Sequence, residues 1–145
     1  MKGIDAMKRK SFCLVLVGML FAAYFVVPVS AISTRASAQI MRYSTDAKAV
    51  GNGRIAMKFS ILGTDIMDTI GAKRIQIYSQ VGGRWVITEI YSQDDAGMSD
   101  TDTYTYANTV YYDGTSGTYY KIVITVFAED DAGSDSRTET HYVTA

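Results

Sequence analysis

Residues 118–128 of this chain read Thr-Tyr-Tyr-Lys-Ile-Val-Ile-Thr-Val-Phe-Ala. Every second residue from Tyr120 onward is apolar or aromatic, and this period of two is typical of a β-strand with one buried face. Burial of Ile122, Ile124 and Val126 would contribute about 1.5 to 3 kcal/mol each. A one-residue shift in pairing would expose that face, so the register of this strand is strongly specified. We expect the other strands to pack around it.

The N-terminal region has the pattern of an export signal. Four basic residues lie within the first ten, and an uncharged run from Ser11 to Ile32 follows. A basic start, an apolar stretch and small residues at the end are typical of secretory signals. The apolar stretch of about 16 residues is short against the roughly 20 that span a bilayer. We therefore predict a signal peptide over residues 1–31, with cleavage after Ala31. Cleavage after Ala38 and retention as a membrane anchor are the alternatives.

Cysteine and charge content bound what the exported chain can do. The single cysteine, Cys13, lies inside the predicted signal, so the mature chain could form no disulfide and no cysteine-ligated metal site. Cleavage leaves about 114 residues, enough for one domain with a core. Ten Lys and Arg and 14 Asp and Glu remain, a net charge near −4. Such a surface argues against nucleic-acid binding, which would need a basic stripe.

Segments with strand character alternate with turn signals along the rest of the chain. The glycines of Gly51-Asn52-Gly53 and Val81-Gly82-Gly83 tolerate the positive φ of tight turns, and the second group predicts a hairpin. Residues 65–71 are predicted to form a connection, with a one-turn helix as the alternative. Residues 93–102 are predicted to be an acidic loop. Strands are expected over residues 38–50, 55–61, 73–80, 84–91, 103–112, 118–128 and 136–143.

This pattern predicts the fold class. About seven short strands, with no helix of ten residues outside the signal, favour an all-β fold: a single antiparallel β-sandwich. In terms of domains, the signal peptide (residues 1–31) is followed by an N-terminal segment at 32–50 that carries the weak first strand. The β-sandwich domain then spans residues 51–145.

The stretch from Gly117 to Ala128 resembles the penultimate strand of immunoglobulin-like and fibronectin type III-like domains. In those domains a tyrosine opens the strand, and its hydroxyl bonds backward to the preceding loop. The resemblance implies an immunoglobulin-like sandwich, with Tyr120 as the corner residue. The paired cysteines of antibody domains are missing, and Trp85 does not stand where their core tryptophan would.

The layout of the chain also resembles a group of small uncharacterised secreted proteins of Gram-positive bacteria. The likeness rests on the signal, on Gly63-Thr64, Met67-Asp68 and Ile70-Gly71-Ala72, and on the ending Val143-Thr144-Ala145. It implies export and a bacterial source, and it supplies no site.

Catalytic and metal-binding patterns are weak. His141 is the single histidine, and its neighbours on a polar strand predict a solvated or cross-strand position, so we expect no catalytic residue. Two similar acidic strings, Asp94-Asp95-Ala96-Gly97 and Asp130-Asp131-Ala132-Gly133, offer the oxygen ligands that calcium prefers. Aspartate and glycine are also ordinary turn formers, and we favour that interpretation. No metal site and no cofactor is therefore predicted.

Aromatic residues are the remaining candidates for a site. Trp85, Tyr91, Tyr104 and Tyr106 could line a sheet face, where aromatic rings stack on sugars or anchor a protein partner. Packing into the core and across strands is the favoured alternative for these residues taken together, with Trp85 the expected exception.

These observations predict a secreted, extracellular and non-enzymatic β-sandwich protein. Its expected role is binding or surface interaction with an extracellular protein or glycan. It would bind no nucleic acid and would meet a membrane only through the signal peptide during export. A bacteriocin-like effector and a carbohydrate-binding accessory module are the alternatives.

Overall fold

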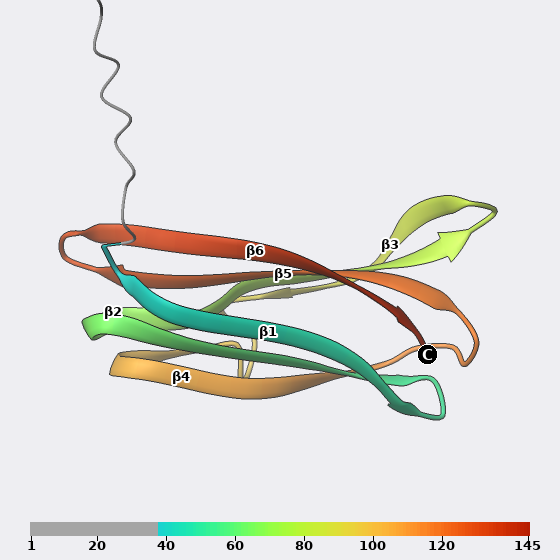
Figure 1. The fold of residues 1–145 in the computed structure, drawn as a ribbon, viewed down its shortest axis with the longest axis horizontal. Coiled ribbons are helices and arrows are strands. Elements are labelled where there is room, and N and C mark those ends of the chain that lie inside the picture. The colour runs from blue at the N-terminus through green and yellow to red at the C-terminus, as the bar shows by residue number, and fades with distance from the viewer. Residues whose placement is uncertain (1–37) are drawn as a thin grey trace, which may run out of the picture. The chain divides into compact units, whose positions relative to one another are not determined.

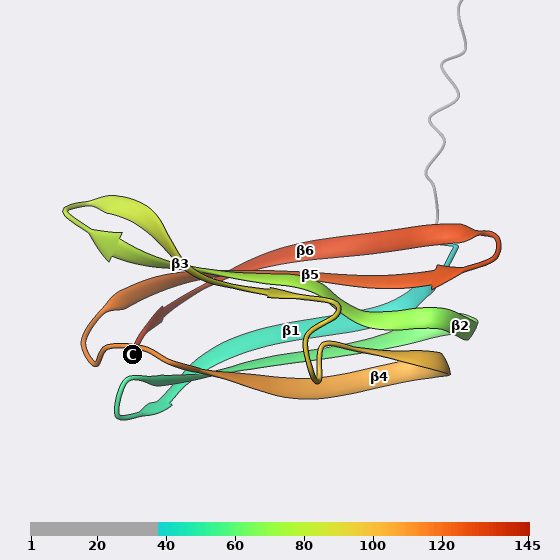
Figure 2. The ribbon, with the colours of Figure 1, turned by 180° about the vertical axis from the view of Figure 1, so that it is seen from behind.

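The computed structural model describes residues 38–145, which form a six-stranded antiparallel sheet (Figures 1 and 2). The predicted signal peptide at residues 1–31 and its preferred cleavage site lie outside the described residues. The all-β class and the antiparallel pairing are confirmed. The strands are β1 (Ile40–Gly51), β2 (Arg54–Val81), β3 (Arg84–Ser92), β4 (Ser99–Asp113), β5 (Tyr119–Asp130) and β6 (Gly133–Thr144).

The structure has six strands instead of about seven because β2 is continuous through residues 65–71. The predicted connection there is wrong, since Met67 pairs with Thr103 of β4 and residues 69–71 are paired on both sides: Thr69 lies opposite Thr101 of β4 and opposite Glu129 of β5. Met67 and Ile70 are fully buried, so their burial supports the extended backbone across the bend.

Gly71 shows why the sequence misleads at this point. A β-carbon there would lie 2.6 Å from the Cα of Ser99, so only glycine lets β4 approach β2 this closely. Glycine in this segment thus serves strand pairing, whereas in the sequence it was interpreted as a turn.

The long strand β2 divides the sheet into two halves. Residues 54–62 of β2 pair with β1 and with the second part of β4, and we call this set the β1 half. Residues 69–81 of β2 pair with β3 and β5, and β5 pairs with β6, which together form the β5 half. The sheet curls so that β5 and β6 lie over β1 and β4 (Figures 1 and 2).

The core lies between the inner faces of the two halves. Ile122, Ile124 and Val126 of β5 are fully buried, as the alternation of that strand predicts. The predicted strand from Ile55 to Ile61 likewise buries its apolar side. The fully buried core residues are Ile55, Met57, Ile61, Met67, Ile70, Ala72, Ile75, Ile77, Met98, Ile122, Ile124, Val126 and Ala128.

Two of the predicted turns fix the ends of the sheet. The hairpin at Gly82-Gly83 is confirmed, because Val81 pairs with Arg84 across it. Before β5, the backbone amide of Thr115 donates a hydrogen bond of 2.8 Å to the hydroxyl of Tyr120, the backward bond expected of this tyrosine. The ring of Tyr120 is buried and meets that of Tyr112 edge-on at 5.7 Å.

The acidic loop before β4 is shorter than predicted. β4 begins at Ser99, so Asp100 and Asp102 belong to a strand and not to the loop. Met98 is fully buried, and its carbonyl oxygen accepts a hydrogen bond of 2.7 Å from the amide of Ala72. This buried anchor lets β4 start pairing with β2 close to the loop.

Candidate binding site

Three aromatic rings lie together on the outer face of the β5 half, the face that points away from the core. The ring of Trp85 lies 5.5 Å from that of Tyr119 and 5.8 Å from that of Tyr142, and the two tyrosine rings stack at 6.0 Å. We call this set the aromatic cluster. Tyr119 is 40% and Tyr142 55% exposed, so the rings offer apolar area and polar tips to solvent.

A lysine adds positive charge to the aromatic cluster. The ammonium of Lys121 lies 4.2 Å from the ring centre of Tyr78 and 5.4 Å from that of Trp85. Both distances are within the range of cation–π attraction, which orients the lysine side chain over the rings. Lys121 is half-buried against them, so a cation stands beside the exposed rings.

Strand register explains how residues from four strands meet at this place. Lys121 of β5 lies opposite Tyr78 of β2 on one side and opposite Tyr142 of β6 on the other. Trp85 of β3 lies opposite Gln80, two residues along β2 from Tyr78. Residues opposite each other share a face, so all of these side chains point outward.

The four residues predicted for an aromatic site do not form one. Trp85 lies in the aromatic cluster. Tyr91 is half-buried against the core side of β3, and its hydroxyl reaches the carbonyl of Tyr111 at 3.5 Å. Tyr106 packs on the ring of Phe59, with ring centres 6.0 Å apart. Tyr104 is 57% exposed on β4 and belongs to the other half of the sheet.

The sequence prediction missed Tyr78, Tyr119, Lys121 and Tyr142. Tyr119 and Lys121 occupy the polar side of the strand at residues 118–128, so its alternation does place them outside. What the sequence lacks is the pairing of this strand with β2 and β6, which alone brings Tyr142 and Trp85 to them.

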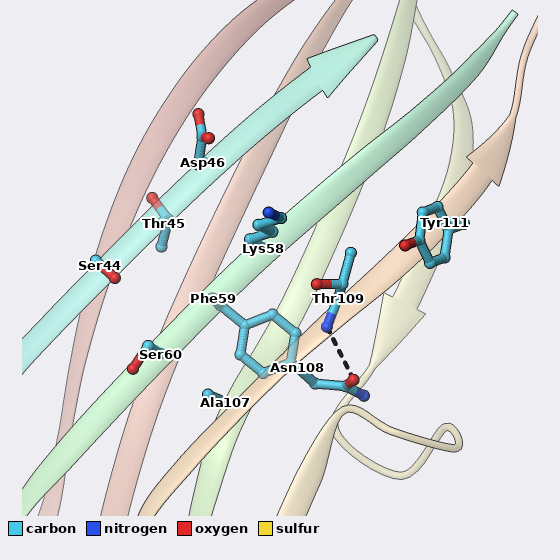
Figure 3. A pocket seen from close by; sticks show the side chains of 10 residues that line it. All are labelled: Ser44, Thr45, Asp46, Lys58, Phe59, Ser60, Ala107, Asn108, Thr109 and Tyr111. Carbon is cyan, nitrogen blue, oxygen red and sulfur yellow. Dashed lines mark hydrogen bonds between the residues drawn. The ribbon is translucent and has the colours of Figure 1, made fainter. Parts of the chain in front are cut away.

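A shallow groove of about 730 Å³ crosses the outer face of the β1 half. Figure 3 shows small side chains from three neighbouring strands on its floor, including Ser44, Ser60 and Ala107. Lys58 of β2 lies opposite Asp46 of β1 on one side and opposite Thr109 of β4 on the other. The carboxylate of Asp46 pairs with Lys48 at 2.9 Å, and that hydrogen bond lowers the pKa of Asp46. The groove is thus polar and carries charges of both signs.

A polar cluster joins β1 to β6. The hydroxyl of Thr45 lies 2.7 Å from the carboxylate of Glu139 and 2.7 Å from Nε2 of His141. The hydroxyl has one proton and a carboxylate can only accept, so Thr45 donates to Glu139 and accepts from the Nε2–H of His141. For His141 to act as the base, its Nε2 would instead have to accept the hydroxyl proton. Burial, and then the hydrogen bond and charge of Glu139, raise the pKa of nearby Tyr43.

The acidic strings considered for calcium serve as turn caps. The carboxylate of Asp95 accepts a hydrogen bond of 2.7 Å from the amide of Ser92. One carboxylate oxygen of Asp130 accepts from the amides of Ala132 and Gly133, at 2.9 and 3.0 Å. Within residues 38–145, no group of three or more His, Cys, Asp or Glu side chains is placed to hold a metal ion.

In the part of the chain that the structure describes, no helix is long and apolar enough to cross a membrane.

The comparisons with known proteins give one likeness of fold. No family model matches the sequence, and no curated protein matches it. Among solved structures, the chain is similar to the crystal structure of Spo0M, sporulation control protein, from Bacillus subtilis, with a TM-score of 0.43 and 8% sequence identity. The match covers 72% of this chain and 49% of that one, so the chain spans about half the length of that protein. The likeness concerns the all-β fold alone.

Proposed function

We propose that this chain is a secreted, non-enzymatic binding protein whose curled sheet is an immunoglobulin-like β-sandwich. The aromatic cluster carries the proposal. Trp85, Tyr119 and Tyr142 gather aromatic ring area on the outer face of the β5 half, and large aromatic side chains dominate binding energy in protein interfaces. The backward hydrogen bond of Tyr120 supports the immunoglobulin-like interpretation.

Export and an extracellular location are supported by the sequence. The basic start, the apolar stretch and the small residues that follow it are the parts of a secretory signal. A mature chain without cysteine does not depend on disulfides, so its stability outside the cell would come from packing. A Gram-positive bacterial source is part of this proposal.

A non-enzymatic role is supported by the way the polar cluster is arranged. The hydroxyl of Thr45 donates a hydrogen bond to Glu139 and accepts one from the Nε2–H of His141, so the imidazole does not face it as the base of a hydroxyl–histidine pair. The cluster instead ties β1 to β6. We assign it a structural role.

The partner in this proposal is an extracellular protein or glycan, and the charge of the chain argues against nucleic acid. Residues 38–145 hold nine Lys and Arg against 14 Asp and Glu, a balance that repels a polyanion as densely charged as nucleic acid. The bacteriocin-like effector is the second candidate, and growth inhibition by the purified mature protein would favour it.

Binding to intact cells of a Gram-positive bacterium tests the proposed function. Fluorescently labelled mature protein should bind the cells, and Trp85→Ala should lower that binding at least about tenfold, since central aromatic anchors contribute about 2 kcal/mol or more. Tyr104→Ala is the control, because Tyr104 is an exposed aromatic residue on β4 that lies outside the aromatic cluster. Equal binding by wild type and Trp85→Ala would refute the proposed site.

A further inference from the structure

We propose that the outer face of the β5 half binds a polysaccharide chain that carries negative charge. This inference rests on the proposed function and specifies its ligand class. Along β5 from Tyr119 to Thr125, this face includes 15 side chains that carry the argument: Arg74, Gln76, Tyr78, Gln80, Trp85, Ile87, Ile90, Tyr119, Lys121, Val123, Thr125, Thr138, Thr140, Tyr142 and Thr144.

Charge is distributed unevenly between this face and the rest of the protein. Residues 38–145 contain 14 Asp and Glu, yet none of them is among these 15 side chains; Glu129, on the same side of β5, lies four residues beyond Thr125. Two of those 15, Arg74 and Lys121, are cations. In an acidic protein, a stretch of surface with cations and no acids is where an anionic polymer meets attraction and the least local repulsion.

The aromatic cluster suits sugar rings. The faces of Trp85 and the two tyrosines carry negative quadrupole charge, which attracts the C–H groups on the flat side of a sugar. Their polar tips can at the same time bond to hydroxyl groups. The ring centres lie within 6.0 Å of one another, the two tyrosine rings are stacked at 23°, and Trp85 is tilted against them at 46° and 48°, so one sugar chain can contact all three rings.

Hydroxyl and amide groups extend the platform along the strands. Gln76 and Gln80 on β2, with Thr138 and Thr140 on β6, give donors and acceptors that match sugar hydroxyls. The face runs along β5 from Tyr119 to Thr125, roughly 20 Å at the rise of a strand. A linear chain of several sugars fits this length better than a single sugar.

Lys121 selects for negative charge. Its contacts with Tyr78 and Trp85 hold the ammonium over the rings, so a carboxylate, sulfate or phosphate on a sugar stacked there would find the cation in place. Arg74 lies opposite Thr125 and Lys121 opposite Tyr78 along the same pair of strands, so successive anionic units could meet both cations.

Affinity electrophoresis tests the inference with polygalacturonate and hyaluronan as anionic probes and dextran as the neutral one. We expect both anionic probes to retard the mature protein, with dextran having little effect. Trp85→Ala should weaken binding at least about tenfold. Lys121→Gln should weaken binding several-fold, and Lys121→Arg should restore it. Added salt should also weaken binding, because it screens the attraction between the cation and the anionic probe. Lys58→Gln removes a cation from the opposite half and is the control.

The outcomes separate the inference from the proposed function. Equal retardation by dextran, or an unchanged affinity in Lys121→Gln, overturns the role of charge. If neither anionic probe binds when its repeating sugar unit is present at millimolar concentration, the proposed ligand class is wrong. If cell binding still depends on Trp85 after that failure, and protease treatment of the cells abolishes it, the proposed function stands with a protein as its ligand. Circular dichroism and melting curves verify that each variant is folded.

Discussion

Replacing Tyr120 with phenylalanine isolates one hydrogen bond at the end of the core. The change keeps the buried ring and its edge-on contact with Tyr112, and it removes the hydroxyl that accepts the 2.8 Å bond from the amide of Thr115. A hydrogen bond of this type contributes about 1 kcal/mol net. Water can reach the amide of Thr115, which is exposed, so the cost should not rise far above that value.

Urea unfolding of the mature protein measures this cost. With a slope of about 1 to 3 kcal/mol per molar urea, a loss of about 1 kcal/mol lowers the midpoint by roughly 0.5 M, and the melting temperature by about 4 °C. Tyr120→Ala should cost about 3 to 5 kcal/mol because it also empties the ring's space. Tyr119→Phe, on the exposed side of the same strand, should change stability by less than about 0.5 kcal/mol.

Two results would refute the reasoning about Tyr120. A midpoint for Tyr120→Phe equal to that of wild type would mean that the hydrogen bond does not stabilise the loop. A loss as large as that of Tyr120→Ala would mean that the hydroxyl, and not the ring, holds this end of the core.

Three further predictions concern stability. Gly71→Ala should destabilise the protein by more than about 1 kcal/mol in urea unfolding, because its β-carbon would lie 2.6 Å from the Cα of Ser99; a neutral result would show that β4 can move away. Ile124→Ala should cost about 2 to 5 kcal/mol, and a smaller loss would contradict its place in the core. Partial desolvation and neighbouring carboxylates such as Asp131 raise the pKa of Asp68 in the folded protein. Ionisation of this carboxyl therefore lowers the stability of the fold as pH rises through that pKa. Asp68→Asn should raise the melting temperature at neutral pH, but not below about pH 3; the opposite pH trend would refute this.

The periodicity of the sequence predicted most of the strands. Residues 118–128 and 55–61 alternate cleanly, and both bury the apolar side as expected. The hairpin at Gly82-Gly83 was also predictable, since paired glycines between two β-rich runs have few other uses. Local chemistry decides these features, so a single sequence contains the information.

Features that depend on distant strands were not predictable. Asp65, Gly71 and the residues between them resemble a turn, and only the approach of β4 shows that this glycine serves a continuous strand. The aromatic cluster joins residues 85, 119 and 142, whose separation in sequence conceals their contact. Trp85 was predicted to be an exposed exception, but its neighbours follow from the register of β2 with β3 and of β5 with β6.

One strand, β2, belongs to both halves of the sheet, which form the two walls around the core. β2 pairs with four other strands, and it supplies the middle of each half of the sheet. A break in β2 near its bend would therefore deprive both walls of their central strand at once, whereas the tip at Gly82-Gly83 joins only β2 to its edge strand β3. Loss of structure in such an arrangement is concerted, because neither wall keeps a complete set of neighbours when the other opens.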